Sequence, residues 1–172
     1  MRTVLVGSPP AEVEAWLERR RQLGLDRFDE VWEGECHVVP GPHGRHGRVD
    51  HELVRLLGPR ADEAGLYGSG PLNIGHPADY RVPDQAYLRT PDVELYQPSA
   101  ALVVEIVSPG DETRRKLEFY HRAGAEELLI VDPEAHTVEW FARAAGRFVP
   151  TDHSQLLGLS AAELAAAITW PD

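Results

Sequence analysis

The run AALVVEIV, from Ala100 to Val107, constrains the fold more than any other part of the sequence. β-branched and other apolar side chains occupy both alternating faces of this run, which is typical of a strand covered on both sides. Ser108, Pro109 and Gly110 follow at once and end the strand. We therefore expect a central strand in a sheet that has helices packed on both faces.

The segments around this strand alternate between helical and strand patterns. Helices are predicted at 11–23, 46–64 and 111–123 and after the N-cap Ser160. A hairpin is predicted over 28–39, with 35–39 as its second strand. Further strands are predicted near 71–74, 82–88, 128–131, 137–141 and 148–149. This order predicts an α/β fold, or an α+β mixed sheet flanked by helices, in a single domain spanning residues 1–172.

Composition narrows the classes of function. The net charge of -11 at pH 7 argues against a protein that coats nucleic acid by bulk electrostatics, although it permits an acidic, metal-binding cleft. The sequence has no long apolar run and no signal-peptide pattern, so we expect a cytoplasmic protein without a membrane partner.

Cys36 is the only cysteine, and we interpret it as a buried thiol that packs in the core. Gly68 and Gly70 fit no phosphate-binding motif, and no organic cofactor is expected.

Glu105 is the most informative single residue because it interrupts the apolar run. An ionised, unpaired carboxylate inside a covered strand would be very costly. A bound metal, a buried arginine partner or a strand face that opens into a cleft would each offset that cost. The remaining alternative is a strand that is half exposed, with Glu105 pointing to solvent.

Asp84 and Lys116 are two further candidate functional residues. Pro83-Asp84 precedes it by 21 residues at the start of another candidate strand, although the same dipeptide also occurs in ordinary turns. Two carboxylates on neighbouring strands would suit Mg²⁺ or Mn²⁺. Lys116 is the only lysine among the 17 lysine and arginine residues. This bias favours a functional role for Lys116 that requires a compact ammonium group. The alternative for Lys116 is a surface ion pair with Glu112.

A rival metal site is formed in the sequence by His43, His46, Asp50 and His51. Imidazole and carboxylate groups are suitable ligands for zinc or manganese. The spacing is poor, because His51 is rotated by about 100 degrees from Asp50 on a helix. We keep this site as the less favoured alternative.

The order of several short motifs resembles the Uma family of the PD-(D/E)XK nuclease superfamily, formerly a domain of unknown function. The motifs are Glu33-Gly34-Glu35, 42–47, Val82-Pro83-Asp84, 104–109, Lys116 with Tyr120, and 129–133. The resemblance covers about residues 29 to 141 and implies a restriction-endonuclease-like core.

The resemblance also implies a metal site. Mg²⁺ or Mn²⁺ would be held by Asp84 and Glu105, with the backbone carbonyl of Ile106 as an additional ligand. The superfamily's usual lysine position, two residues after the glutamate, is Val107 here. Lys116, on the following helix, is the residue that matches the catalytic lysine of the Uma family.

Two more candidate catalytic residues match positions near the family's site. Glu35, on the hairpin, either completes the metal shell or faces solvent. His46, at the head of the second helix, either contacts phosphate or serves as a helix-start residue.

The function implied is that of a metal-dependent endonuclease that hydrolyses phosphodiester bonds of DNA. The alternative is a non-catalytic module with the nuclease scaffold that binds nucleic acid or protein, as a homodimer. The acidic balance favours this alternative, since the only basic clusters are Arg19 to Arg21 and Arg114 with Arg115.

Overall fold

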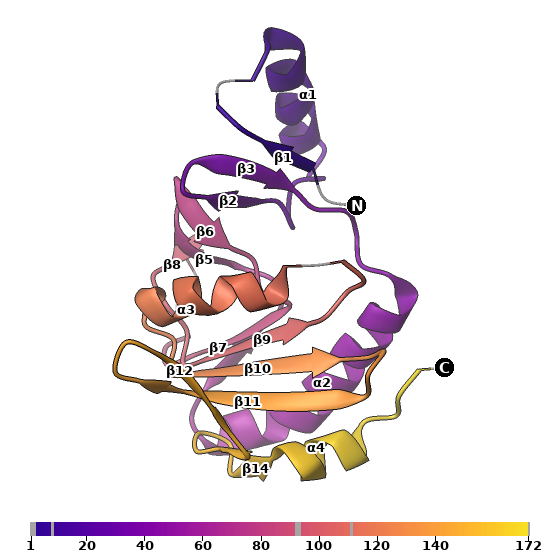
Figure 1. Cartoon of the computed structure of the whole chain (residues 1–172), viewed down its shortest axis with the longest axis vertical. Coiled ribbons are helices and arrows are strands. Elements are labelled where there is room, and N and C mark those ends of the chain that lie inside the picture. Colours follow the sequence, from indigo (N-terminus) through magenta and orange to yellow (C-terminus); the bar gives the residue numbers. More distant parts are fainter. Residues whose placement is uncertain (1–2, 8, 92–93, 111, 172) are drawn as a thin grey trace.

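The computed structural model describes residues 3–7, 9–91, 94–110 and 112–171 of the chain. Within these residues the strands form two six-stranded sheets, here called sheet A and sheet B, and one small two-stranded sheet. In Figure 1, sheet A lies toward the end of the molecule that carries α1, and sheet B lies toward the end that carries α4.

Sheet B contains the strand predicted from the apolar run. Its order is β12-β11-β10-β9-β7-β4. The bounds are β4 Tyr67–Ser69, β7 Gln85–Leu88, β9 Leu102–Ile106, β10 Glu127–Asp132, β11 Thr137–Ala144 and β12 Arg147–Thr151. β9 and β10 are parallel, and the other neighbours are antiparallel. β9 is therefore an inner strand, and the predicted edge strand near 148–149 is confirmed as β12.

Helices cover both faces of sheet B, and the alternation of β9 assigns each side chain to one face. Leu102, Val104 and Ile106 pack in one apolar cluster with the buried side of α2 (Gly44–Glu63) and with α4 (Ala161–Ala167). Val103 packs in the other cluster, against α3 (Leu117–Ala123). Glu105 shares the face of Val103, so its carboxylate is directed toward α3.

Sheet A is built from shorter strands in the order β1-β3-β2-β6-β5-β8. The bounds are β1 Thr3–Leu5, β2 Glu30–Trp32, β3 Glu35–Val38, β5 Asn73–His76, β6 Asp79–Arg81 and β8 Tyr96–Gln97. The helix α1 (Ala11–Gln22) lies beyond β1 at one end of the molecule, and α3 lies between the two sheets (Figure 1).

The mixed sheet flanked by helices is confirmed, with two refinements. The hairpin predicted at 28–39 is confirmed as β2 and β3, but it belongs to sheet A rather than to the sheet of β9. The helix predicted at 111–123 begins as the 3-10 turn η1 (Thr113–Lys116) before α3, and Asp111 lies outside the described residues. The single domain over 1–172 stays a prediction.

The C-terminal segment follows the expected pattern. A small sheet of β13 (His153–Ser154) and β14 (Leu159–Ser160) leads into α4. Ser160 caps that helix, because its Oγ accepts from the N–H of Glu163 while the Glu163 carboxylate accepts from the N–H of Ser160. Among the helices described, none combines the length and the apolar character needed to cross a bilayer.

Candidate active site

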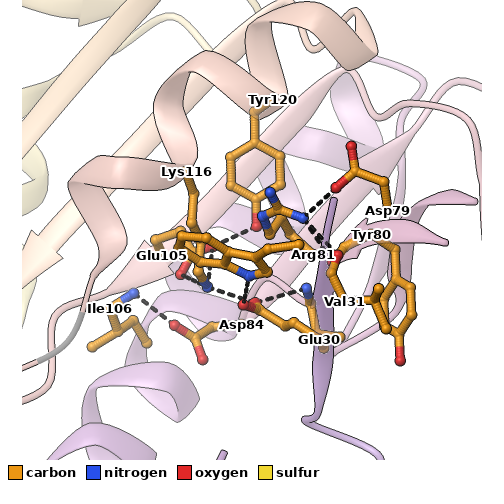
Figure 2. A network of polar contacts seen from close by, with 12 residues as sticks. Glu30, Val31, Asp79, Tyr80, Arg81, Asp84, Glu105, Ile106, Lys116 and Tyr120 are labelled. Atoms are coloured by element: carbon orange, nitrogen blue, oxygen red, sulfur yellow. Dashed lines mark hydrogen bonds and ion pairs between the residues drawn. The ribbon is translucent and has the colours of Figure 1, made fainter. Parts of the chain in front are cut away.

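A cavity of about 260 Å³ lies where sheet A, sheet B, the start of α2 and η1 meet. Glu30, His46, Asp84, Glu105 and Lys116 all line it. Figure 2 shows Glu30 and Glu105 meeting at Lys116, with Asp84 close by and bonded to the N–H of Ile106, although the four side chains come from four separate segments of the chain. Four of the five residues selected from the sequence as catalytic are thus brought together.

Glu105 is buried beside the two polar groups that α3 and η1 present to it. The Nζ of Lys116 lies 2.9 Å from Oε1 and 3.0 Å from Oε2 of Glu105. The hydroxyl of Tyr120 donates to Oε1 of Glu105. Lys116 and Tyr120 are four residues apart, so one helical face directs both groups at the same carboxylate (Figure 2).

Glu30 is a second buried carboxylate on Lys116, and it comes from sheet A. Its Oε1 lies 2.9 Å from the Nζ of Lys116 and accepts from the N–H of Val82 at 3.0 Å. Its Oε2 accepts from the indole N–H of Trp32 at 2.7 Å. Glu30 is only 2% exposed. Lys116 therefore joins the two sheets through one carboxylate from each.

Asp84 lies just before β7 and is held by groups from α2 and β9. Its Oδ1 is 2.8 Å from Nε2 of His46, and its Oδ2 accepts from the N–H of Ile106 at 2.6 Å. The Nδ1 of His46 lies 3.0 Å from Oγ of Ser108. These contacts fix the direction of the Asp84 carboxylate at the cavity wall.

The burial of these groups changes their proton affinities. Burial raises the pKa of Glu105 to about 7, with Asp84 and Glu30 adding to the rise and the ammonium of Lys116 opposing it. Burial lowers the pKa of Lys116, but Glu105 and Glu30 outweigh it and hold that pKa above its ordinary value. The pKa of Tyr120 is raised by burial and by Glu105. The cluster therefore holds its protons tightly.

The donor chemistry of the cavity suits a hard divalent cation. Asp84 and Glu105 both line it, and Mg²⁺ is usually bound through one or two carboxylates with several waters retained. Each carboxylate oxygen can accept two hydrogen bonds, and Oδ1 and Oδ2 of Asp84 each have one of the contacts given above. Ile106 also lines the cavity, where its N–H holds Asp84.

The remaining sequence expectations can be placed. Glu35 is half-buried in β3 opposite Trp32 and is not one of the described residues that line the cavity. The surface pair of Lys116 with Glu112 is wrong, since Glu112 pairs with Arg115 and Lys116 is buried on Glu105. A solvent-facing Glu105 is wrong as well, because that residue is 3% exposed.

The rival zinc or manganese cluster does not form. Across the described ranges, no group of three or more His, Cys, Asp or Glu side chains is arranged to hold a metal ion. Asp50 instead accepts from the side-chain amide of Gln85 at 2.7 Å, and His46 turns to Asp84. A site on Asp84 and Glu105 would therefore be a two-carboxylate site completed by water.

The sequence analysis missed Glu30 and selected its hairpin neighbour Glu35. A signal for Glu30 was present in the alternation of the strand. Glu30 and Trp32 are two residues apart and share a face, and a large aromatic ring indicates that this face is buried. The hydroxyl of Ser108 gave no signal of its own, because its contact with His46 joins residues 62 positions apart.

Comparison with known proteins identifies the family and the fold. The family model Uma2, described as "Putative restriction endonuclease", matches residues 13–169. A solved structure described as a "putative nuclease belonging to DUF820" from Anabaena variabilis superposes with a TM-score of 0.66 at 17% identity, covering 81% of this chain and 90% of that one. The chain matches no curated protein. The fold is thus of the restriction-endonuclease-like type that the sequence motifs implied.

Proposed function

Because the chain belongs to the Uma2 family of "putative restriction endonucleases", we propose that it is a divalent-metal-dependent endonuclease that hydrolyses phosphodiester bonds of DNA. The family and the fold support a nuclease role. The observation that carries the proposal is the convergence of Asp84 and Glu105, from neighbouring strands, on a cavity that also holds the buried Lys116.

Asp84 and Glu105 are the residues that would hold the cation, which we propose to be Mg²⁺ or Mn²⁺. Such a cation polarises a phosphoryl oxygen and lowers the pKa of a bound water. The contacts from His46 and from the N–H of Ile106 keep Asp84 directed at the cavity, so the oxygen donors are oriented before substrate arrives.

Lys116 is the cationic group proposed to act on the substrate. Lys116 is only 8% exposed at the cavity wall, and the fixed positive charge of its ammonium in such a buried position stabilises negative charge developing on a phosphate far better than in bulk solvent. Glu30 and Glu105 hold this ammonium from two sides. We propose that Glu30 is a positioning residue for Lys116 and that it does not touch the substrate.

The test uses the full-length protein with plasmid DNA and Mg²⁺ or Mn²⁺. Glu105→Gln and Asp84→Asn keep side-chain size but remove an anionic ligand, and each should reduce cleavage roughly 100-fold or more. Calorimetric titration with Mn²⁺ should show weaker binding for both variants. Glu118→Gln, an exposed acid on α3, is the matched control and should behave as the wild type. Equal cleavage by wild type and Glu105→Gln would overturn the proposal.

A second candidate is a module that binds nucleic acid or protein without cleaving it. The observation that favours it is that Lys116 contacts both oxygens of Glu105, the same carboxylate that a cation would need. Calorimetry separates the two candidates, since wild-type protein that binds neither Mg²⁺ nor Mn²⁺ would be the module. For both candidates we propose that the acting unit is a homodimer.

A further inference from the structure

Part of the cavity wall is apolar and comes from the segments on either side of the β2–β3 hairpin. Phe28 lies just before β2, and Val39, Pro40 and Pro42 follow β3 on the link to α2. This link runs from sheet A to the helix that packs on sheet B (Figure 1). Phe28 is half-buried and belongs to neither of the two apolar clusters of the described core. The chemistry proposed for the site uses the carboxylates and the ammonium, and it leaves this apolar wall unexplained.

The Phe28 ring has a cation beside it. The guanidinium of Arg27 lies 5.8 Å from the centre of the ring, and Arg27 is exposed. An aromatic ring has two faces, so a cation on one of them leaves the other for a flat partner. An aromatic ring together with positive charge is the combination that binds single-stranded nucleic acid, because bases stack on the ring and phosphates lie along the cations.

The size of the cavity limits the form of DNA that can reach its polar groups. Its volume of about 260 Å³ is at the low end of small-molecule sites, which span about 300 to 1,000 Å³, so it can accept one nucleotide but not a duplex. Glu105 and Lys116 are only 3% and 8% exposed, and a phosphate must enter the cavity to approach them. In a duplex the strand has to unpair first, which costs free energy that a single strand does not need.

The charges around the cavity permit an anionic strand although the whole chain is acidic. Residues 36–49 contain no acid, and Arg45 and Arg48 are both exposed in the first two turns of α2, on either side of His46, which lines the cavity. The acids that line the cavity each have a basic partner: Glu30 and Glu105 pair with Lys116, Asp84 with His46, and Glu112 with Arg115. Arg45 and Arg48 therefore place positive charge where a strand entering the cavity would pass.

We propose that the cavity binds an unpaired nucleotide of single-stranded DNA, with its base stacked on Phe28 and with neighbouring phosphates on Arg45 and Arg48. This inference rests on the proposed function, because it names the form of DNA that the nuclease site accepts. Every base has a flat π surface, so stacking on Phe28 should give little sequence preference. Negatively supercoiled plasmid remains a substrate, since supercoiling favours local unpairing.

The experiment measures dissociation constants of the full chain for labelled oligodeoxynucleotides in EDTA, so that metal-dependent cleavage does not interfere. A single strand should bind roughly 10-fold more tightly than the duplex of the same sequence. Phe28→Leu keeps an apolar side chain but removes the flat ring, and it should weaken single-strand binding roughly 10-fold, whereas Phe28→Trp should bind like wild type. Tyr67→Leu, at an exposed ring in β4, is the matched control and should change nothing.

Two further measurements separate stacking from charge. In a single strand that carries several 2-aminopurine bases, the fluorescence should change on binding to wild type and much less on saturation with Phe28→Leu. Arg45→Gln with Arg48→Gln should reduce the slope of log Kd against log salt by roughly 1.4, since each phosphate contact of a single strand contributes about 0.7. Arg55→Gln with Arg147→Gln removes the same charge at exposed positions that are not among the described residues of the cavity wall, and it should leave the slope unchanged.

Two results would overturn the inference. One is equal affinity of wild type for single strand and duplex, and the other is single-strand binding by Phe28→Leu that matches wild type, with circular dichroism showing that the variant keeps its fold. Neither result affects the nuclease proposal, which is overturned instead by equal plasmid cleavage by wild type and Glu105→Gln. The two failures are therefore distinguishable.

Discussion

The two large sheets contribute to the cavity in different ways. Sheet B supplies Glu105 from β9, a strand in which every residue is buried and whose neighbours on both sides are also strands. Sheet A supplies Glu30 from β2, a strand of three residues. The register of β9 directs Glu105 toward α3, where Lys116 and Tyr120 hold its carboxylate. The Val82 N–H and the Trp32 indole hold the carboxylate of Glu30. Glu105 is thus carried by a fully buried strand of five residues, and Glu30 by a short strand of sheet A.

We therefore expect sheet A and sheet B to lose stability through different kinds of substitution. The packed core of sheet B should tolerate polar changes at the surface but lose stability when apolar volume is removed. Sheet A has less buried apolar area, so its position should depend on a few polar and cation-π contacts. Lys116 depends on both sheets, because it pairs with one carboxylate from each.

Glu30→Gln should have the largest effect on stability. Glutamine removes the charge that faces Lys116, and its amide nitrogen cannot accept from the Trp32 indole N–H, the Val82 N–H or the ammonium. Breaking one partner of a buried ion pair costs about 3 to 5 kcal/mol. Urea unfolding measures the change. Glu35→Gln, in the same hairpin, is the matched control and should stay within about 0.5 kcal/mol of wild type; equal losses for both would show that Glu30 is not specially held.

Val103→Ala compared with Val38→Ala tests the difference in packing. Val103 is fully buried in β9, and its truncation should cost about 2 kcal/mol from lost burial and the cavity left behind. Val38 is half-buried in β3, and the same truncation there should cost less than about 1 kcal/mol. The measurement is again the free energy of unfolding in urea. Similar losses at both positions would mean that sheet A is packed as firmly as sheet B.

The same difference explains how much could be predicted from the sequence. The buried strand β9, Glu105 and Lys116 left clear signals, because a charge inside an apolar run and a single lysine are rare. Asp84 gave a weak signal alone and was selected through its pairing with Glu105 and the family resemblance. The short strands β4, β6 and β8 left almost none, since two or three residues show no periodicity.

The role of Glu30 was hidden for a related reason. Its partners Val82 and Lys116 lie 52 and 86 residues away in the chain, and only the tertiary fold brings the three residues together. Glu35 was selected from its match to the family, and the shared face of Glu30 and Trp32 was not considered.

Arg81→Lys tests whether specific side-chain contacts hold sheet A in place. The Arg81 guanidinium lies 4.3 Å from the centre of the Trp32 ring and 4.2 Å from that of Phe119, so it connects sheet A to α3. Lysine keeps the charge but loses the planar group that stacks between two rings. We expect a loss of about 1 to 2 kcal/mol in urea unfolding. Arg122→Lys, at a half-exposed site, should change stability by less than about 0.5 kcal/mol, and an equal loss there would contradict the assignment.

Asp79→Asn should have the smallest effect, and its pH dependence identifies the cause. Burial raises the pKa of Asp79, but the Glu33 N–H and Arg81 outweigh it and hold the pKa below its ordinary value of 3.8. A depressed carboxyl pKa stabilises the fold above the unfolded value, and that contribution is lost as the pH falls through the folded value. The advantage of wild type over Asp79→Asn should therefore be about 1 kcal/mol at neutral pH and shrink below about pH 4. An advantage that stays constant or grows on acidification would show that the charge of Asp79 does not contribute to holding Arg81 and sheet A in place.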